Sequence, residues 1–348
     1  MFSTSNKMLF LQPSLSSLLA LFLVLAACGD AEPLRRFHMK AVNNYTTLYV
    51  DPSGYGHFSS IQSAIDHIPS NNEQWVRIYI KAGIYNEQIL IPSDKPFIYI
   101  QGEGKWKTRV IWGGSGPIIT CATLISQADN IVIKSVSFTN SYNHPPGSNK
   151  NQIKAAVAAM ISGDKSAFYR CAFLGFQDTL WDDQGRHYFK LCTIQGAVDF
   201  IFGDGQSIYE RCTVSVVAGA LRGLTGFITA QGRNSPADPS GFIFKDCNVI
   251  GDGTTYLGRP WRDYARVIFY NTSMSNVVVP QGWNAWGFTG HEYQLTFAEH
   301  DCHGIGANTS GRVGWEHKLS DEMVKKLTDL TFIDNDGWII QQPFSMVN

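Results

Sequence analysis

FYRCAF at residues 168–173 is one copy of a short repeat that determines how this chain folds. Each copy has an aromatic, charged or apolar lead-in, a marker residue that is usually cysteine, and an apolar residue two positions later. The other copies are FKLCTI (189–194), ERCTV (210–214), FKDCNV (244–249), IKSVSF (133–138) and FYNTSM (269–274). Successive markers, from Val136 to Thr272, are 35, 21, 20, 35 and 25 residues apart. A period of about 20 residues with occasional insertions predicts stacked units whose insertions form loops.

The repeats alternate inward and outward residues as β-strands do, and no long helical pattern separates them. The sequence therefore predicts an all-β fold: a right-handed, single-stranded parallel β-helix, in which each coil buries its inward side chains against neighbouring coils. Cys171, Cys192 and Cys212 are expected to stack as an apolar ladder inside it. A disulfide such as Cys212–Cys247 stays open, because sequence cannot fix connectivity.

The open ends of such a solenoid need covers. SSIQSAIDHIPS (59–70) predicts an amphipathic helix over the N-terminal end, because serines can cap it and the apolar positions 61, 64, 65 and 68 share one face. SDEMVKKLTDL (320–330) predicts a second short capping helix, with Met323, Leu327 and Leu330 on one face. No linker-like stretch interrupts the rest, so we expect one domain.

The N-terminus predicts export. LLALFLVLAA (18–27) follows Lys7 and precedes small residues, which is typical of a signal peptide and is short for a membrane span. We expect residues 1–31 to be removed, leaving a domain over 32–348. LAAC (25–28) would also fit a bacterial lipoprotein signal. Three glycosylation triplets are compatible with a secreted glycoprotein, at Asn44, Asn271 and Asn308.

The composition of the chain narrows the classes of partner that it could bind. The chain has 348 residues, 44% of them apolar, and a formal net charge of -1. No basic stretch stands out, which argues against a nucleic-acid or membrane-surface partner. The cysteines contain no C-x-x-C pair, so a zinc site is not expected.

Two aspartates occupy equivalent places in neighbouring repeats. In GFQDTLW (175–181) Asp178 lies seven residues after Cys171, and in GAVDFIFGDG (196–205) Asp199 lies seven after Cys192. Equal offsets put the two carboxylates one above the other on adjacent coils, about 4.8 Å apart along the axis. One carboxyl should then have a raised pKa while the other stays ionised. Either residue alone could be an ordinary turn or buried ion-pair aspartate; the pair predicts acid/base or nucleophilic chemistry.

YLGRPW (256–261) supplies a third element. The Arg259 guanidinium can hold a carboxylate bidentately and keep it ionised. The flat ring of Trp261 suits stacking on a sugar. Gly258 and Pro260 would equally encode a simple surface turn.

With these three blocks in this order, the chain resembles the pectin methylesterases, and most closely the plant members. GIYNE (83–87), GDKSAFYRC (163–171) and TAQGR (229–233) strengthen the resemblance, which runs from about Leu48 to Phe344. It implies a β-helical hydrolase (EC 3.1.1.11), secreted to the cell wall, that demethylates homogalacturonan and releases methanol. The family's inhibitor-like N-terminal pro-domain is not expected here.

The resemblance also implies residue roles. Asp199 would attack the ester carbonyl, and Asp178 would protonate methanol and then activate water. Gln177 would donate to the oxyanion, and Arg259 would hold Asp199. Four aromatic residues would line the sugar cleft: Trp181, Phe202, Trp261 and Trp283. No metal or organic cofactor is implied, the partner is pectin, and a monomer is expected; a proteinaceous pectinesterase inhibitor stays open as a second partner.

One position departs from the family pattern. Where the family has Gln-Ala-Val-Ala, with a second oxyanion glutamine, this chain has Ala155-Ala156-Val157-Ala158, and Gln152 lies three residues too early. Loss of one such donor costs on the order of 10² to 10³ in rate in other hydrolases. A slow esterase and a non-catalytic pectin-binding homologue therefore both stay open. So does another pectin-degrading β-helix enzyme, a polygalacturonase or lyase, although the Gln-Asp pair and the arginine fit ester hydrolysis better.

Overall fold

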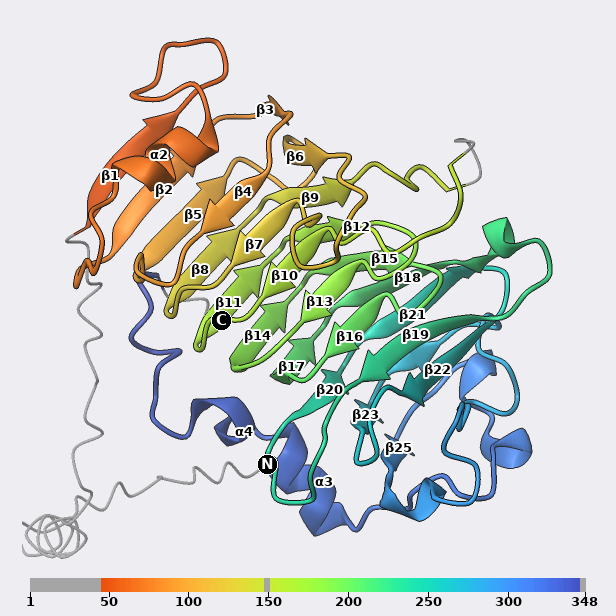
Figure 1. Ribbon diagram of the computed structural model, residues 1–348. Coiled ribbons are helices and arrows are strands. Elements are labelled where there is room, and N and C mark those ends of the chain that lie inside the picture. Colours follow the sequence, from red (N-terminus) through yellow and green to blue (C-terminus); the bar gives the residue numbers. More distant parts are fainter. Residues whose placement is uncertain (1–44, 147–150, 345–348) are drawn as a thin grey trace, which may run out of the picture. The chain divides into compact units, whose positions relative to one another are not determined.

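The computed structural model describes residues 45–146 and 151–344, in which the chain winds through three parallel sheets, named A, B and C here (Figure 1). Sheet A comprises β1 (Thr46–Val50), β2 (Val76–Ile80), β5 (Ile98–Gly102), β8 (Ile131–Lys134), β11 (Ser166–Tyr169), β14 (Arg186–Lys190), β17 (Gln206–Glu210), β20 (Gly241–Lys245), β23 (Arg266–Tyr270) and β25 (Thr296–His300). Sheet B comprises β3 (Gly83–Tyr85), β6 (Thr108–Trp112), β9 (Ser137–Asn140), β12 (Ala172–Leu174), β15 (Thr193–Gly196), β18 (Thr213–Val217), β21 (Asn248–Asp252) and β24 (Ser273–Met274).

Sheet C comprises β4 (Ile89–Ile91), β7 (Leu124–Ser126), β10 (Ala159–Ile161), β13 (Leu180–Asp182), β16 (Ile201–Gly203), β19 (Gly226–Gln231) and β22 (Thr255–Pro260). The short helices are α2 (Ile61–His67), α3 (Asp321–Thr328) and α4 (Thr331–Asp334), with 3-10 turns η1 (Ala218–Leu221), η2 (Glu292–Gln294), η3 (Ile305–Ala307) and η4 (Thr309–Gly311). Successive coils add neighbouring strands to each sheet, so the predicted right-handed parallel β-helix is confirmed.

The repeat marks the turn from sheet A to sheet B. The residue before each marker has the left-handed backbone conformation, with φ of 52° at Arg170, 57° at Leu191 and 53° at Arg211. One such residue turns the chain by a corner, and the marker that follows points inward. Stacked corners of the same shape keep consecutive coils in register.

The predicted cysteine ladder is confirmed, and the disulfide left open between Cys212 and Cys247 is absent. Cys171, Cys192, Cys212 and Cys247 are all buried free thiols. Each donates to a backbone carbonyl, Cys212 to Phe189 O at 3.3 Å, for example. The markers sit one per coil with their thiols directed at backbone oxygens, so they act as small interior residues.

Aromatic rings fill the interior beside this ladder. Phe168, Phe189, Tyr209, Phe244 and Phe269 stack in that order, with ring centroids 5.1, 4.6, 4.6 and 4.5 Å apart. A one-residue slip of any strand would turn its ring from the interior to the outer face of sheet A, so the stack fixes the register that aligns the turns described below.

The predicted N-terminal cap is confirmed as α2. Ile61, Ala64 and Ile65 are buried in the main core at the end of the first coil, and Ser60 caps the helix by accepting from Ser63 N at 3.2 Å. Glu87 also accepts from the backbone N–H groups of Ile61 and of the next residue, at 2.9 and 3.0 Å. A carboxylate at a helix N-terminus is favoured by the helix dipole.

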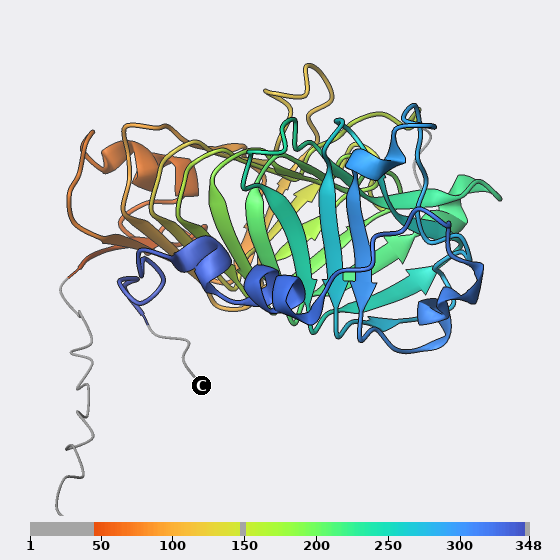
Figure 2. The same cartoon turned by 90° about the horizontal axis from the view of Figure 1, so that it is seen from below.

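The second predicted helix forms but does not cap the end. Together with α4, α3 lies along the outer face of sheet A, where Leu327 and Ile333 pack in one cluster with Ile208 and Ile243; Figure 2 shows these blue helices beside the sheet. The strands of sheet A are apolar on both faces, so their outer face needs cover. Met323 is 44% exposed, and the buried face is shifted to Val324, Leu327 and Thr328.

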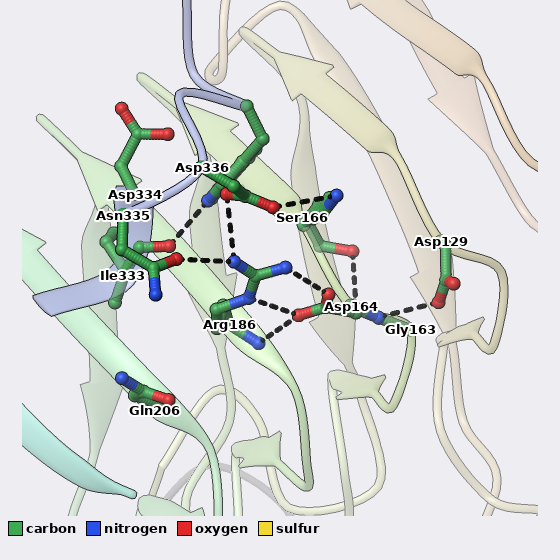
Figure 3. Close-up of polar contacts among 12 residues, drawn as sticks. Asp129, Gly163, Asp164, Ser166, Arg186, Gln206, Ile333, Asp334, Asn335 and Asp336 are labelled. Carbon is green, nitrogen blue, oxygen red and sulfur yellow. Dashed lines mark hydrogen bonds and ion pairs between the residues drawn. The ribbon is translucent and has the colours of Figure 1, made fainter. Parts of the chain in front are cut away.

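Polar contacts fasten the C-terminal segment to the coils (Figure 3). Arg186 on β14 donates to Asp164 at 3.0 and 2.6 Å and to Asp336 at 2.9 Å, and Lys165 lies 3.0 Å from Asp336. In the described ranges we find no helix with the length and apolar character of a membrane span. The predicted signal peptide over 1–31 and the triplet at Asn44 lie outside the described residues.

Candidate active site

The two aspartates lie at the turns between sheets B and C on neighbouring coils. Gln177 pairs with Val198, and Asp178 N donates to Val198 O at 3.0 Å. Because the next strand pair keeps the same offset of 21, with Leu180 opposite Ile201, Asp178 and Asp199 occupy equivalent positions. Both have the left-handed conformation, φ 57° and 46°, which aspartate tolerates better than most residues.

A glycine makes this turn compact. A Cβ added to Gly196 would lie 2.2 Å from Cβ of Phe200 and 2.9 Å from Oγ1 of Thr179. No side chain fits there, so the chain can bend closely enough for Phe200 to turn into the core while Asp199 stays at the rim.

Arg259 holds Asp199 in the bidentate arrangement that the sequence predicts. Its Nε donates to Asp199 Oδ1 at 2.8 Å, and its second nitrogen donates to Oδ2. Arg259 belongs to β22 and pairs with Ala230 of β19, which in turn pairs with Phe202. Because the side chain of Ala230 is small, it leaves room for the Arg259 side chain to extend past β19 to the coil of Asp199.

Two aromatic rings sandwich the guanidinium. Its carbon lies 4.1 Å from the ring centre of Phe227 and 3.9 Å from that of Trp286. Phe227 lies one coil on, where its N–H donates to Ala197 O at 2.9 Å, and it is therefore opposite Val198, next to Asp199. These cation–π contacts fix the plane of the guanidinium, and with it the plane of the carboxylate.

The surroundings of the two carboxyl groups affect their pKa values differently. Burial and, to a smaller extent, the nearby charge of Asp199 raise the pKa of Asp178 from 3.8 to about 7, against the opposing charge of Arg259. Burial also raises the pKa of Asp199, but here the hydrogen bonds and charge of Arg259 work directly against it. Among the described residues only Asp199 of the two has an ion-pair partner, so the surroundings favour the ionised form of Asp199 over that of Asp178.

An aromatic floor adjoins this pair on the outer face of sheet C. Trp181 and Phe202 are direct partners on β13 and β16 and stack with ring centres 5.4 Å apart; Trp261 meets Phe202 edge-on at 6.0 Å. Three of the four predicted cleft residues are thus neighbours on the face that carries Arg259. Trp181 and Phe202 are 8% and 5% exposed and Trp261 is half-buried, so only a small part of this cluster is open to solvent.

The fourth prediction, Trp283, is wrong. Trp283 is 1% exposed and stacks on Phe297 inside the β-helix, with ring centres 4.7 Å apart. The exposed ring of the segment QGWNAW is Trp286, at 52%, which contacts Arg259. Sequence reasoning missed it, because the segment has two tryptophans three residues apart and nothing local shows which of them points outward.

Gln177 is available as a donor and Ala155 is not. Within residues 45–146 and 151–344 the side-chain amide of Gln177 has no protein partner, and its backbone oxygen accepts from Ala156 N at 3.1 Å. Ala155 therefore lies beside Gln177, one coil away. Gln152 is exposed, and its backbone oxygen accepts from Asn143 at 3.2 Å, which holds it in the preceding loop.

Comparison with known proteins gives the same family throughout. The sequence model of the family Pectinesterase matches residues 47–336. The chain is 56% identical over 299 residues to "Probable pectinesterase 29" and 54% identical to "Probable pectinesterase 55", both of Arabidopsis thaliana; the matches cover 85% of this chain and 89% and 91% of those proteins. The structure "Pectin methylesterase from Carrot" superposes with a TM-score of 0.79 at 29% identity, covering 86% of this chain and 96% of that one. This chain therefore belongs to the pectinesterase family.

Proposed function

We propose that this pectinesterase removes methyl esters from homogalacturonan with Asp199 as the nucleophile and Asp178 as the acid and base. One observation carries the assignment: two carboxyl groups stand at equivalent places on adjacent coils, and only one of them has an arginine, with Arg259 bonded to both oxygens of Asp199. The arginine keeps Asp199 ionised and oriented, while Asp178 holds the proton that a leaving alkoxide needs.

In the first half of the reaction, an Asp199 oxygen attacks the carbonyl carbon of the methyl ester. Gln177 donates from its amide to the oxyanion of the tetrahedral intermediate. As the bond from carbon to the methoxy oxygen breaks, Asp178 gives its proton to that oxygen, and methanol leaves. The product is an anhydride between Asp199 and the sugar carboxyl group.

In the second half, Asp178 is a carboxylate and accepts a proton from water. The resulting hydroxide attacks the sugar carbonyl carbon of the anhydride, Asp199 leaves as a carboxylate paired with Arg259, and Asp178 is protonated again. The pKa of Asp178, about 7, suits both roles near neutral pH, because neither protonation state is strongly disfavoured.

The direct test is methanol release from highly methylated pectin by the mature protein. We expect methanol and free carboxyl groups in equal amounts, and none from fully demethylated polygalacturonate. New reducing ends or unsaturated products without methanol would instead indicate a polygalacturonase or a lyase.

Ala155→Gln is expected to raise kcat, by up to about 10²-fold, because it adds the second oxyanion donor beside Gln177. Ala155→Met is the matched control, since methionine has a similar length and no amide. Steady-state kinetics on methylated pectin would measure both. Equal rates in the two variants would contradict a missing donor, and methanol from Ala155→Gln alone would mean that the natural protein is a pectin-binding homologue.

We also propose that the protein is secreted to the cell wall, where its substrate lies, and acts as a monomer without metal or organic cofactor. Asn271 and Asn308 are both exposed, which supports their use as glycosylation sites. A proteinaceous pectinesterase inhibitor remains a candidate partner.

A further inference from the structure

The outer face of sheet B differs in charge from the rest of the molecule. Its first six strands, β3, β6, β9, β12, β15 and β18, contain no aspartate or glutamate, and their one charged residue is Arg109. The chain as a whole has a formal net charge of -1, so its acidic residues lie elsewhere. These six strands therefore have no acidic side chain to repel an anion; the next strand, β21, ends with the exposed Asp252.

Cations line the edge of this face where sheet A turns into sheet B. Arg170 and Arg211 are exposed turn residues, two coils apart. The coil between them has Leu191 at the same place, and there Lys105 supplies the charge: its Nζ donates to Leu191 O at 3.4 Å and to Thr193 Oγ1 at 2.8 Å. Three consecutive coils thus carry one cation each, at a spacing of about 4.8 Å along the axis.

Lys105 reaches this place from a distant coil. It belongs to the turn between β5 and β6, where Gly104 N donates to Ser135 O on the following coil at 3.2 Å. From there its side chain passes the coil of Arg170 to reach that of Leu191. The two hydrogen bonds of its Nζ hold Lys105 between Arg170 and Arg211, although all three side chains are positively charged.

The three cations, named the basic edge here, have no acidic partners. Among the residues that the structure describes, none of Lys105, Arg170 and Arg211 forms an ion pair. The acids closest in sequence are already engaged: Glu210 with Lys190 at 3.1 Å, and Glu103 with Lys81 at 3.3 Å. The row of cations ends at the next coil, where the corner residue is Asp246, which accepts from Asn271 at 2.7 Å.

An exposed aromatic ring completes the edge. Trp106 is 59% exposed, and the Lys105 ammonium lies 5.5 Å from its ring centre. A tryptophan left in solvent beside a row of cations offers stacking to a sugar ring while the cations meet carboxylates.

We propose that the basic edge is a second, non-catalytic binding site for a stretch of demethylated homogalacturonan. Such a stretch carries one carboxylate per sugar, and an extended polyanion running along the coil axis would meet a cation on each of three coils. The choice of this polymer as the ligand rests on the proposed function, because demethylated homogalacturonan is the product of that reaction. Sheet B separates the two sites: β12 begins at the turn of Arg170 and ends at the turn of Asp178. The enzyme would thereby stay attached to wall regions that it has already demethylated.

The test is binding of polygalacturonate, with no turnover required, to the mature protein and to Arg170→Gln/Arg211→Gln. Glutamine removes the charge of arginine and should leave the left-handed backbone conformation of the turn unchanged. Exposed ion pairs are weak, so we expect affinity to fall by about three- to tenfold at low salt. The loss should shrink as salt is raised, because exposed charges are screened. The kcat on a short, fully methylated oligogalacturonate should not change.

Lys325→Gln/Lys326→Gln on α3 is the matched control, since it removes two exposed positive charges far along the chain from the basic edge. It should bind polygalacturonate as the natural protein does. Equal affinity in all three proteins, or an equal loss in both variants, would overturn the proposal. Failure to release methanol from pectin would count against the proposed function and leave this binding measurement interpretable by itself.

Discussion

Asp199→Asn is expected to lower kcat for methanol release by about four to six orders of magnitude, the range found when one member of a catalytic triad is removed. Asparagine has the same shape and tolerates the same left-handed backbone, but its amide cannot form the anhydride. Phe227 and Trp286 would still hold the Arg259 guanidinium in place. The loss should therefore appear in kcat rather than in folding, which a melting temperature measured alongside would check.

Asp246→Asn is the matched control for this variant. Asp246 also has the left-handed conformation, φ 55°, but it stands at a turn between sheets A and B and accepts a hydrogen bond from Asn271 at 2.7 Å. We expect its kcat to stay within about twofold of the natural protein, as for most surface substitutions away from a site. If Asp199→Asn kept a tenth or more of its activity, Asp199 would not be the nucleophile.

The pairing of the two aspartates could be predicted because the repeat fixes it. Each marker cysteine follows a one-residue corner, and the seven residues from Cys171 to Asp178 and from Cys192 to Asp199 then follow the same path. Offset arithmetic is reliable where no insertion intervenes. The same offset of 21 residues relates Trp181 to Phe202, which are partners on neighbouring strands and stack.

The sequence could not predict which tryptophan of QGWNAW points inward. The segment has no strand periodicity, and the outcome depends on the rings of Phe269 and Phe297 on other coils, between which Trp283 packs. With Trp283 buried, Trp286 is free to cover Arg259. A wholly local pattern contains no information about such a choice.

The position of α3 was unpredictable for a similar reason. An amphipathic pattern shows that a helix has an apolar face but does not show which surface that face meets. The apolar outer face of sheet A decided it, through residues such as Ile208 and Ile243. A further buried group, Asp182, held by His187 at 2.5 Å and by Tyr209 at 2.5 Å, also gave no local signal, since its partners are five and 27 residues away.

Asp178→Asn should have the second large effect, and it separates catalysis from stability. General acid and base catalysis contributes about 10² to 10⁴ in rate, so kcat should fall by that amount. The amide can donate a hydrogen bond to the methoxy oxygen but cannot transfer a proton. Measured on methylated pectin, the loss should be smaller than that of Asp199→Asn, because the nucleophile remains.

The same variant should be more stable than the natural protein above pH 7. The pKa of Asp178 is raised from 3.8 to about 7 in the folded protein. Between these values the folded state retains a proton that the unfolded state has lost, so the free energy of unfolding falls as pH rises from about 4 to about 7. Asparagine, which does not titrate, removes that loss, worth on the order of a few kcal/mol at about 1.4 kcal/mol per pKa unit.

Melting temperatures at pH 4, 6 and 8 would test this. The difference between Asp178→Asn and the natural protein should be small at pH 4, grow through pH 6 and be largest at pH 8, while Asp246→Asn shows no such trend. A variant that is inactive yet more stable at pH 8 would mean that the buried carboxyl group of Asp178 lowers the stability of the protein but is needed for catalysis. If the stability gain belonged to Asp199→Asn instead, the protonated carboxyl would be Asp199, and the roles of acid and nucleophile would have to be exchanged.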